Sequence, residues 1–324
     1  MGDKDISAET GWRSRFALAG PAGEPVDLLR TFRSHGLAAL PPMRLDEGAN
    51  TLEATIPVGG GAPRTVRIRP DGPKLGLVSA VGPAPDGDEG ILRSVRHVLR
   101  LDEDLSPFYE LAGGDPDLRW VTRGAGRMAR GSSVFEEIVK TICTTNCSWS
   151  ATTRMIGALV ENLGEKAPGA PETGPLGRAF PTPRAMAEAG EDFYRDVVRA
   201  GYRGRYMLAL SRAVAEGELD VEALDAPAGE LPDEELERRL LGLPGVGPYA
   251  AAHVMMMLGL YSRLILDSWT RPTYARLTGR EAVPDAEIVG RFSPYGRYAG
   301  LAFWLYLTRG WIDDDEGEPA ARTP

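Results

Sequence analysis

The 324-residue sequence has little cysteine, no long apolar run and no excess of basic residues. Its two cysteines, Cys143 and Cys147, are too few for a disulfide framework. They cannot supply the four thiolates of an iron–sulfur cluster, and two thiols alone make no complete zinc site. The sequence therefore favours a fold that is held together by its hydrophobic core.

A charged-then-apolar leader and a membrane-length apolar segment are both missing from the sequence, so we expect neither secretion nor membrane spanning. Hydrophobic residues make up 43% of the chain, which is typical of a soluble globular protein. The length is sufficient for two domains or for one large domain.

Basic residues are in the minority, because 37 Lys and Arg face 46 Asp and Glu, for a net charge of −9. A protein that held nucleic acid mainly through lysine side chains would be basic. The acidic residues cluster at 102–104, 233–235 and 313–316, which we interpret as solvated surface. Any nucleic-acid binding would therefore rely on uneven charge or on backbone dipoles, with a shallow salt dependence.

A glycine-rich stretch predicts a helix, a tight hairpin and a second helix. The first helix should end at Gly242 in a left-handed C-cap, and Gly245 and Gly247 allow positive φ in the hairpin. Pro248 suits the first position of the second helix, which should run to about Gly259. Backbone N–H groups at such a helix N-terminus can bind an anion without any charged side chain, and the phosphate of a nucleic acid is the obvious candidate.

The segment Leu243-Pro244-Gly245-Val246-Gly247, followed twenty positions later by Asp267, resembles the helix-hairpin-helix DNA glycosylase superfamily. In that superfamily the Asp is catalytic and the hairpin holds the DNA backbone. The resemblance therefore implies that Asp267 is catalytic and that Leu243, Gly245, Val246 and Gly247 bind DNA. The alternative is a plain turn between two core helices, with Asp267 as an ordinary N-cap.

The first part of the chain, residues 1–89, predicts an N-terminal β-rich domain that resembles the sheet domain of the 8-oxoguanine and 3-methyladenine glycosylases. Strand-like segments are 12–19, 52–58, 66–68 and 75–81, with a short helix at 26–34 and a turn at 59–61. Residues 90–312 should form the helical glycosylase domain and 313–324 a disordered acidic tail. The predicted fold class is α+β, an antiparallel sheet domain followed by an all-α domain.

Apolar stripes and capping signals place the helices of the second part. They indicate helices over 91–101 and 105–111, a helix that starts with a capping box at 133–136, and a helix that ends at Gly164. Thr182-Pro183 is a further helix start, and Phe193, Val197 and Val198 form an apolar stripe. The last helix of this group ends near Glu216. Met255, Met256 and Met257 are interpreted as core filler.

Two further segments carry the resemblance. Residues 142–146 look like the loop that, in the oxoguanine branch, inserts an Asn into the hole left by a flipped base, and 201–206 look like that branch's opposite-strand contact segment. The resemblance implies that Asn146, Tyr202 and Arg203 contact DNA. The alternatives are a helix-stopping Asn and an ordinary charged surface loop. Phe180-Pro181-Thr182-Pro183 instead resembles a segment of the 3-methyladenine branch.

Base removal needs a carboxylate beside the sugar, and Asp267 is the candidate for this role. Breaking the base–sugar bond builds positive charge on the sugar, which a fixed carboxylate stabilises while it orients or deprotonates water. Bifunctional members of the superfamily carry a lysine two residues after Gly247, where this sequence has Tyr249. A phenol forms no Schiff base, so we expect no AP-lyase activity and water as the nucleophile.

A flipped base needs a pocket lined by stacking groups. Tyr249 and His253 share one helix face, Trp269 lies just beyond Asp267, and Trp304 and Tyr306 lie on the last apolar helix. We predict that these five residues line the base pocket, where a cationic alkylated purine would stack well. The alternative is that the aromatic residues are core residues and that His253 is a satisfied helix histidine.

Together these features predict a monofunctional DNA glycosylase that acts on a damaged, alkylated purine in double-stranded DNA. The alternatives are an 8-oxoguanine-type glycosylase without lyase activity and a DNA-structure-binding module without catalysis. We expect a cytoplasmic, nucleoid-associated monomer of bacterial type with no membrane partner. No organic cofactor and no metal site is predicted, although the superfamily often holds a monovalent cation on hairpin carbonyls.

Overall fold

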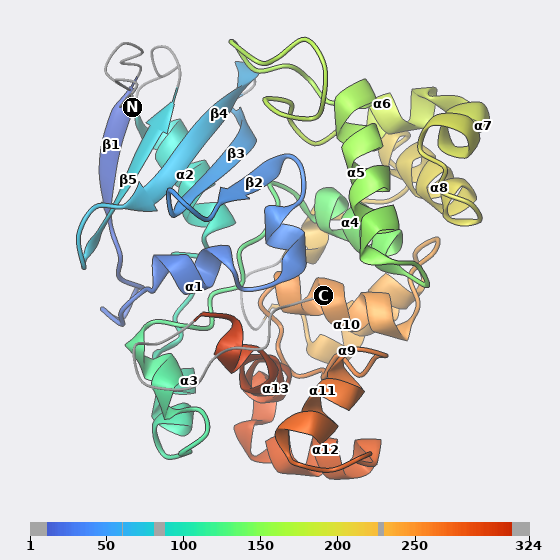
Figure 1. Ribbon diagram of the computed structural model, residues 1–324. Coiled ribbons are helices and arrows are strands. Elements are labelled where there is room, and N and C mark those ends of the chain that lie inside the picture. The colour runs from blue at the N-terminus through green and yellow to red at the C-terminus, as the bar shows by residue number, and fades with distance from the viewer. Residues whose placement is uncertain (1–11, 60, 81–87, 226–229, 313–324) are drawn as a thin grey trace.

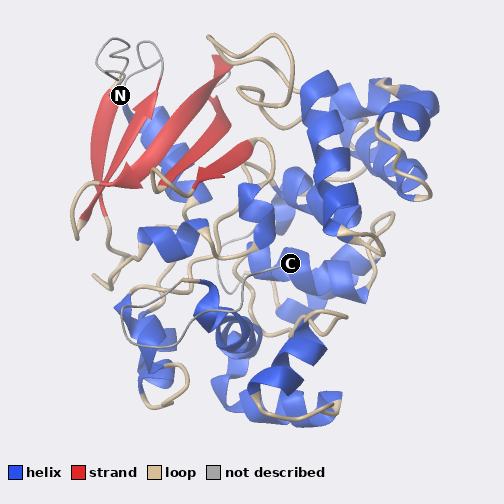
Figure 2. Ribbon diagram, in the orientation of Figure 1, coloured by secondary structure: helices blue, strands red, loops and turns tan. Residues whose placement is uncertain are grey.

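The structure, a computed structural model, describes residues 12–59, 61–80, 88–225 and 230–312. A five-stranded antiparallel sheet comes first in the chain and is followed by helices (Figures 1 and 2). This arrangement confirms the predicted α+β fold class. The predicted acidic tail at 313–324 lies outside the described residues.

The sheet follows the alternation of apolar residues in the sequence. Its strands are β1 (Arg13–Ala17), β2 (Met43–Asp46), β3 (Thr51–Val58), β4 (Gly61–Pro70) and β5 (Leu75–Ala80), in the order β1-β5-β4-β3-β2. On β3, the alternating Leu52, Ala54 and Ile56 are buried. The edge strand β2 was not predicted, because four residues are too few to establish a period of two.

Two helices cover the sheet, α1 (Leu28–Phe32) and α2 (Asp88–Val98). Ile91 and Val95 of α2 share one hydrophobic cluster with Ile68 and Val78 of the sheet, and Figure 1 shows α2 lying against the strands. The core of the sheet therefore continues past residue 89, where the sequence suggested a boundary.

The remaining helices form two further hydrophobic clusters. Their bounds are α3 (Ser106–Gly113), α4 (Val134–Thr144), α5 (Trp149–Leu163), α6 (Pro183–Glu188), α7 (Gly190–Asp192), α8 (Arg203–Ala215), α9 (Asp233–Leu241), α10 (Pro248–Met257), α11 (Thr270–Leu277), α12 (Asp285–Phe292) and α13 (Ala299–Thr308). One cluster joins α4, α5, α8 and α9, and the other joins α3, α11, α12 and α13. Within the described residues, every helix is too short or too polar to cross a membrane.

Helix α10 contributes to both of these clusters. Val254 and Met255 pack in the first, whereas Met256 and Met257 pack in the second. All three methionines are buried, as expected of core filler. This helix therefore fixes the hairpin before it to both groups of helices at once.

The predicted stripe of Phe193, Val197 and Val198 is correct for Val198, which is buried, and for Phe193, which packs against the same cluster, but wrong for Val197. Residues Phe193–Val197 form a π-helical turn, in which the N–H of Val198 donates to the carbonyl of Phe193 at 3.0 Å. The wider turn rotates Val197 outward, where 45% of it is exposed, and buries Tyr194 instead.

Candidate active site

The hairpin between α9 and α10 requires glycine at one position. Gly245 has a φ of 79°, and a Cβ there would lie 2.7 Å from the Cβ of Tyr206. Gly242 instead has right-handed helical geometry, with φ −78°, so the predicted left-handed C-cap is wrong. Gly247 is extended and serves as the N-cap of α10.

The hairpin can meet a ligand mainly through its backbone. The N–H of Val246 donates to the carbonyl of Leu243 at 3.2 Å, which closes the turn. The side chains of Leu243 and Val246 are buried in the hydrophobic cluster beneath it. Pro248 opens α10, and the N–H of Ala251 donates to the carbonyl of Gly247 at 2.8 Å. The N–H groups of Tyr249 and Ala250, between these two residues, are positioned as those that can bind an anion at a helix N-terminus.

A cleft of about 810 Å³ lies beside the hairpin. Its walls consist of Thr144, Thr145, Asn146, Cys147, Tyr202, Gly245, Gly247, Pro248, Tyr249, Ala250, Leu266, Asp267 and Ser268. Four segments that are far apart in the sequence thus meet at one opening. The volume lies in the range of ligand-binding clefts.

Asp267 is fixed at the start of α11. Its Oδ1 accepts the backbone N–H groups of Trp269 and Thr270 at 2.8 and 2.7 Å, and its own N–H donates to Thr270 Oγ1 at 2.8 Å. The side chain therefore caps the start of α11 and also lines the cleft. Capping and the predicted catalytic role are compatible, and the catalytic role stays a prediction. Asp267 forms no ion pair within the described residues, and Oδ2 takes part in neither of the bonds to Oδ1.

Tyr249 lines the cleft, and His253 lies one helical turn behind it. The Tyr249 hydroxyl is 3.3 Å from Thr144 Oγ1, and burial raises the pKa of this phenol. His253 is buried with its ring centroid 5.9 Å from that of Tyr249 and 6.3 Å from that of His35. Burial lowers the pKa of His253 to about 4, so the imidazole is neutral at pH 7.

Trp269 and Trp304 do not line this cleft. Their ring centroids are 5.6 Å apart, and both rings also contact Trp311. The indole N–H of Trp304 donates to the carbonyl of Ser34 at 2.7 Å and so joins α13 to the segment after α1.

Tyr306 lies on another face of α13. Its ring packs against Tyr274 and Phe292 at centroid distances of 5.6 and 5.7 Å. All ten residues of α13 are buried, so its periodicity gives no indication of which face meets the cleft. Tyr306 is a core residue in this structure.

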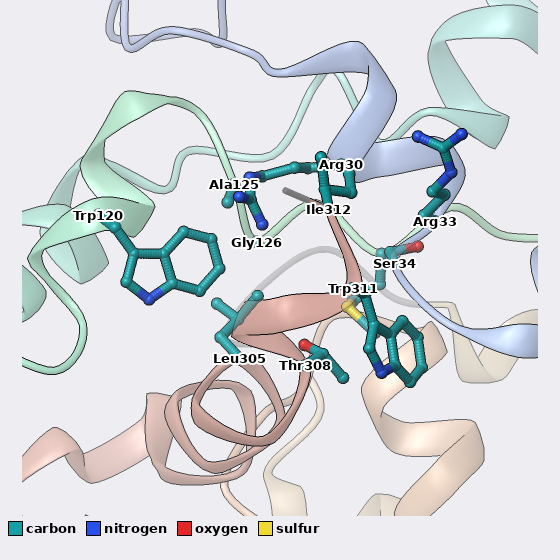
Figure 3. A pocket seen from close by; sticks show the side chains of 11 residues that line it. Arg30, Arg33, Ser34, Trp120, Ala125, Gly126, Leu305, Thr308, Trp311 and Ile312 are labelled. Atoms are coloured by element: carbon teal, nitrogen blue, oxygen red, sulfur yellow. The ribbon is translucent and has the colours of Figure 1, made fainter. Parts of the chain in front are cut away.

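Figure 3 shows a separate cavity between α1 and α13, with Trp120 and Trp311 on opposite sides of it. The guanidinium of Arg30 lies 4.4 Å from the centroid of the Trp120 ring. The cavity measures about 20 Å³, which is enough for a water molecule and far too small for a nucleobase.

The structure places the two predicted DNA-contacting segments together. Asn146 and Tyr202 both line the cleft, and Asn146 Nδ2 donates to the Tyr202 hydroxyl at 3.1 Å. Arg203 is buried behind them and does not line the cleft.

The sequence did not single out Thr144, Thr145 or Cys147 as site residues, although all three line the cleft. Polar residues at this position indicate only that the helix ends there. The local sequence pattern does not show which surface their side chains face. Within the described residues, no group of three or more His, Cys, Asp or Glu side chains could hold a metal ion. A monovalent cation on the hairpin carbonyls stays a prediction.

No family model matches the chain. A DNA-3-methyladenine glycosylase of Bacillus subtilis is 25% identical over 170 residues, which cover 52% of this chain and 54% of that protein. The chain thus spans about half the length of this relative. This match supports the predicted resemblance to the helix-hairpin-helix DNA glycosylase superfamily.

Solved structures of DNA glycosylases share the fold along most of the chain. The 3-methyladenine DNA-glycosylase from Archaeoglobus fulgidus superposes with a TM-score of 0.69 at 21% identity, over 92% of this chain and 98% of that one. An 8-oxoguanine glycosylase/lyase from Clostridium acetobutylicum, in complex with double-stranded DNA, has a TM-score of 0.68 at 21% identity, over 88% of this chain and 92% of that one. At this identity the likeness establishes the fold alone.

Proposed function

We propose that the protein is a DNA glycosylase of base excision repair that hydrolyses the N-glycosidic bond of a damaged purine flipped out of double-stranded DNA. The observation that carries the proposal is the convergence on one cleft of the hairpin glycines, Asn146 and the carboxylate of Asp267. The hairpin would hold a phosphate, the Asn would fill the vacated stack, and the carboxylate would face the sugar.

Asp267 is the proposed catalytic residue. Two backbone N–H groups at the start of α11 hold its carboxylate in place, and no cation within the described residues pairs with it. A sugar that develops positive charge would therefore meet a fixed anion that no ion pair has neutralised. The same carboxylate can orient the attacking water or take its proton.

Tyr249 is the basis for proposing a monofunctional enzyme. It lines the cleft on the first turn of α10, where bifunctional relatives carry the lysine nucleophile. A phenol cannot form the covalent imine, so water attacks the sugar and the DNA strand stays intact.

An alkylated purine is the proposed substrate. Tyr249 and Tyr202 offer aromatic faces in the cleft, which favour a flat, cationic base. The relative from Bacillus subtilis that matches the chain is named for 3-methyladenine. Oxidised guanine is the second candidate, because Asn146 and Tyr202 come from the two segments that resemble the oxoguanine branch and are hydrogen-bonded to each other in the cleft.

The test is single-turnover base release from duplexes that each carry one lesion, ethenoadenine or 8-oxoguanine among them, with and without alkali. Wild-type protein should give strand breaks only after alkali, and Asp267→Asn should give none while it still binds the duplex. Equal binding to every duplex without base release would instead identify a DNA-binding module. Strand breaks before alkali would contradict the role given to Tyr249.

A further inference from the structure

The loop that carries Asn146 is held from behind by an arginine. Arg203 is 7% exposed, and its Nε and Nη2 both donate to the backbone carbonyl of Thr145, the Nε at 2.9 Å. Its Nη1 donates to the carbonyl of Ala200 at 3.3 Å. The guanidinium thus ties the end of α4 to the start of α8.

The same arginine supports the aromatic partner of Asn146. Its guanidinium carbon lies 4.7 Å from the centroid of the Tyr202 ring, and the hydroxyl of that ring accepts the amide N–H of Asn146. Arg203 therefore contacts both the residue before Asn146 and the ring to which Asn146 is bonded. Hydrogen bonds from Thr145 and Asn146 also lower the pKa of Tyr202.

Asn146 needs this support because of its backbone. Its φ is 48°, in the left-handed region, which costs a non-glycine residue about 1 kcal/mol. Its side chain is exposed at the cleft, where the amide Nδ2 donates to the Tyr202 hydroxyl. Contacts that fix Thr145 and Tyr202 reduce the freedom of the loop to relax.

We propose that Arg203 is a positioning residue, which presents Asn146 and Tyr202 to the DNA stack and does not itself touch the nucleic acid. The inference rests on the proposed function. Three of its nitrogen atoms donate to main-chain carbonyls and the side chain is buried, so the guanidinium is not accessible for a bidentate hydrogen bond to a phosphate or a base. The groups that meet the DNA are then a neutral amide and a phenol ring, and stacking on a ring tolerates any base.

The experiment compares a lesion that must be extruded with one that is already unpaired. Single-turnover base release is measured on ethenoadenine in a perfect duplex and on the same base inside an unpaired bubble. Arg203→Ala should lower the duplex rate by about tenfold, equivalent to about 1.4 kcal/mol, and the bubble rate by less than about threefold. An equal loss on both substrates, or no loss on the duplex, overturns the proposal.

One further variant and one further measurement distinguish an effect of the Arg203 charge on DNA from an effect of its position. Arg203→Lys keeps the charge, but an ammonium group cannot donate in the bidentate geometry of the guanidinium to the Thr145 carbonyl. The rates of Arg203→Lys should therefore resemble those of Arg203→Ala. Full recovery by lysine would mean that the cation acts on DNA. The slope of log affinity against log salt should be unchanged in Arg203→Ala, whereas a fall of about 1 would reveal a direct phosphate contact and overturn the proposal.

The matched control is Arg205→Ala, on the same helix, where the side chain is exposed and donates to the hydroxyl of Tyr206. It should leave the ratio of duplex to bubble rates unchanged. If Arg203→Ala does not fold, Tyr202→Phe removes only the hydroxyl that holds Asn146 and should lower the same ratio.

A readout without catalysis separates this proposal from the proposed function. The probe is a duplex with a tetrahydrofuran abasic analogue opposite 2-aminopurine, whose fluorescence reports insertion into the stack. Wild-type protein should change the fluorescence and Arg203→Ala should not, even if no lesion is ever excised. A fluorescence change that persists in Arg203→Ala overturns the positioning role.

Discussion

Two clefts of similar size differ in whether their charged side chains are paired with one another. The cleft at Asp267 measures about 810 Å³, and a second one between α2 and the end of α10 measures about 730 Å³. The second is lined by five arginines (Arg93, Arg96, Arg100, Arg130 and Arg297) and five acids (Asp102, Glu103, Asp104, Asp225 and Asp233). It is far richer in charge, yet its charges are largely committed to one another.

The pairs in the second cleft are close. Arg130 Nη1 lies 2.9 Å from both carboxylate oxygens of Asp225, and Arg100 Nε lies 2.8 Å from Glu103. His97 adds no charge at pH 7, because burial lowers its pKa to about 4. Asp267 is bonded only to backbone N–H groups and Thr270, so its charge stays available to a ligand. We expect an uncommitted charge, rather than the number of charges, to distinguish a reactive cleft from a structural one.

The largest expected effect comes from neutralising one acid in each cleft. Asp267→Asn should reduce single-turnover base release by about 10³-fold, because the developing cation loses its counter-charge. Asp225→Asn should leave base release unchanged and lower the free energy of unfolding by about 1–2 kcal/mol, since it leaves Arg130 half-buried without its acid. Equal effects of the two variants on catalysis would abolish the distinction between the clefts.

The next prediction adds a nucleophile to the reactive cleft. Tyr249→Lys places an amine where burial would keep it partly unprotonated, so borohydride should trap a covalent complex with lesion DNA. Wild-type protein should give no trapped complex above background. A trapped wild-type complex would show that another residue already serves as the amine.

A smaller effect is expected from the hairpin that borders the reactive cleft. Gly245→Ala forces a side chain into a φ of 79° and against Tyr206, so duplex affinity should fall by about tenfold and the melting temperature should drop. Gly242→Ala, in right-handed geometry three residues earlier, should change both by little. Similar losses in both variants would show that the hairpin has no special backbone requirement.

The last prediction concerns stability alone and an acid outside both clefts, Glu137, whose burial is only partly offset by a neighbouring cation. Burial raises the pKa of Glu137 from 4.5 to about 7, although Lys140 opposes this shift. The folded state therefore binds the proton more tightly, and stability is lost as the pH rises from 4.5 to 7. In denaturant titrations, Glu137→Gln should remove that loss, on the order of 1–3 kcal/mol, whereas a pH profile like that of wild type would contradict the assignment.

The sequence was most informative where a local rule determines the backbone. Pro248 at a helix start, Gly245 in a turn and the alternation along β3 each follow from one residue or a short period. The convergence of Asn146, Tyr202, Tyr249 and Asp267 was expected only through the resemblance. No periodicity in the chain could have brought these residues to one cleft.

The sequence-based predictions were wrong where tertiary packing determines which way a side chain faces. Helix α13 is apolar all round, so the pattern could not tell that Tyr306 faces the core while Trp304 faces Ser34. Arg203 reads as a surface charge in sequence, whereas its burial depends on carbonyls from two other segments. One inserted residue in a π-helical turn likewise shifts a helical face, as at Val197.

The methionines of α10 have a mechanical consequence. Because neighbouring side chains of this helix are embedded on opposite sides, the two groups of helices cannot swing apart about the hairpin without exposing apolar surface. We therefore expect the two groups of helices to move as one body, so that under the proposed function the nucleic acid would supply the deformation on binding. Sites that kink at low elastic cost, such as those weakened by damage, would be engaged first.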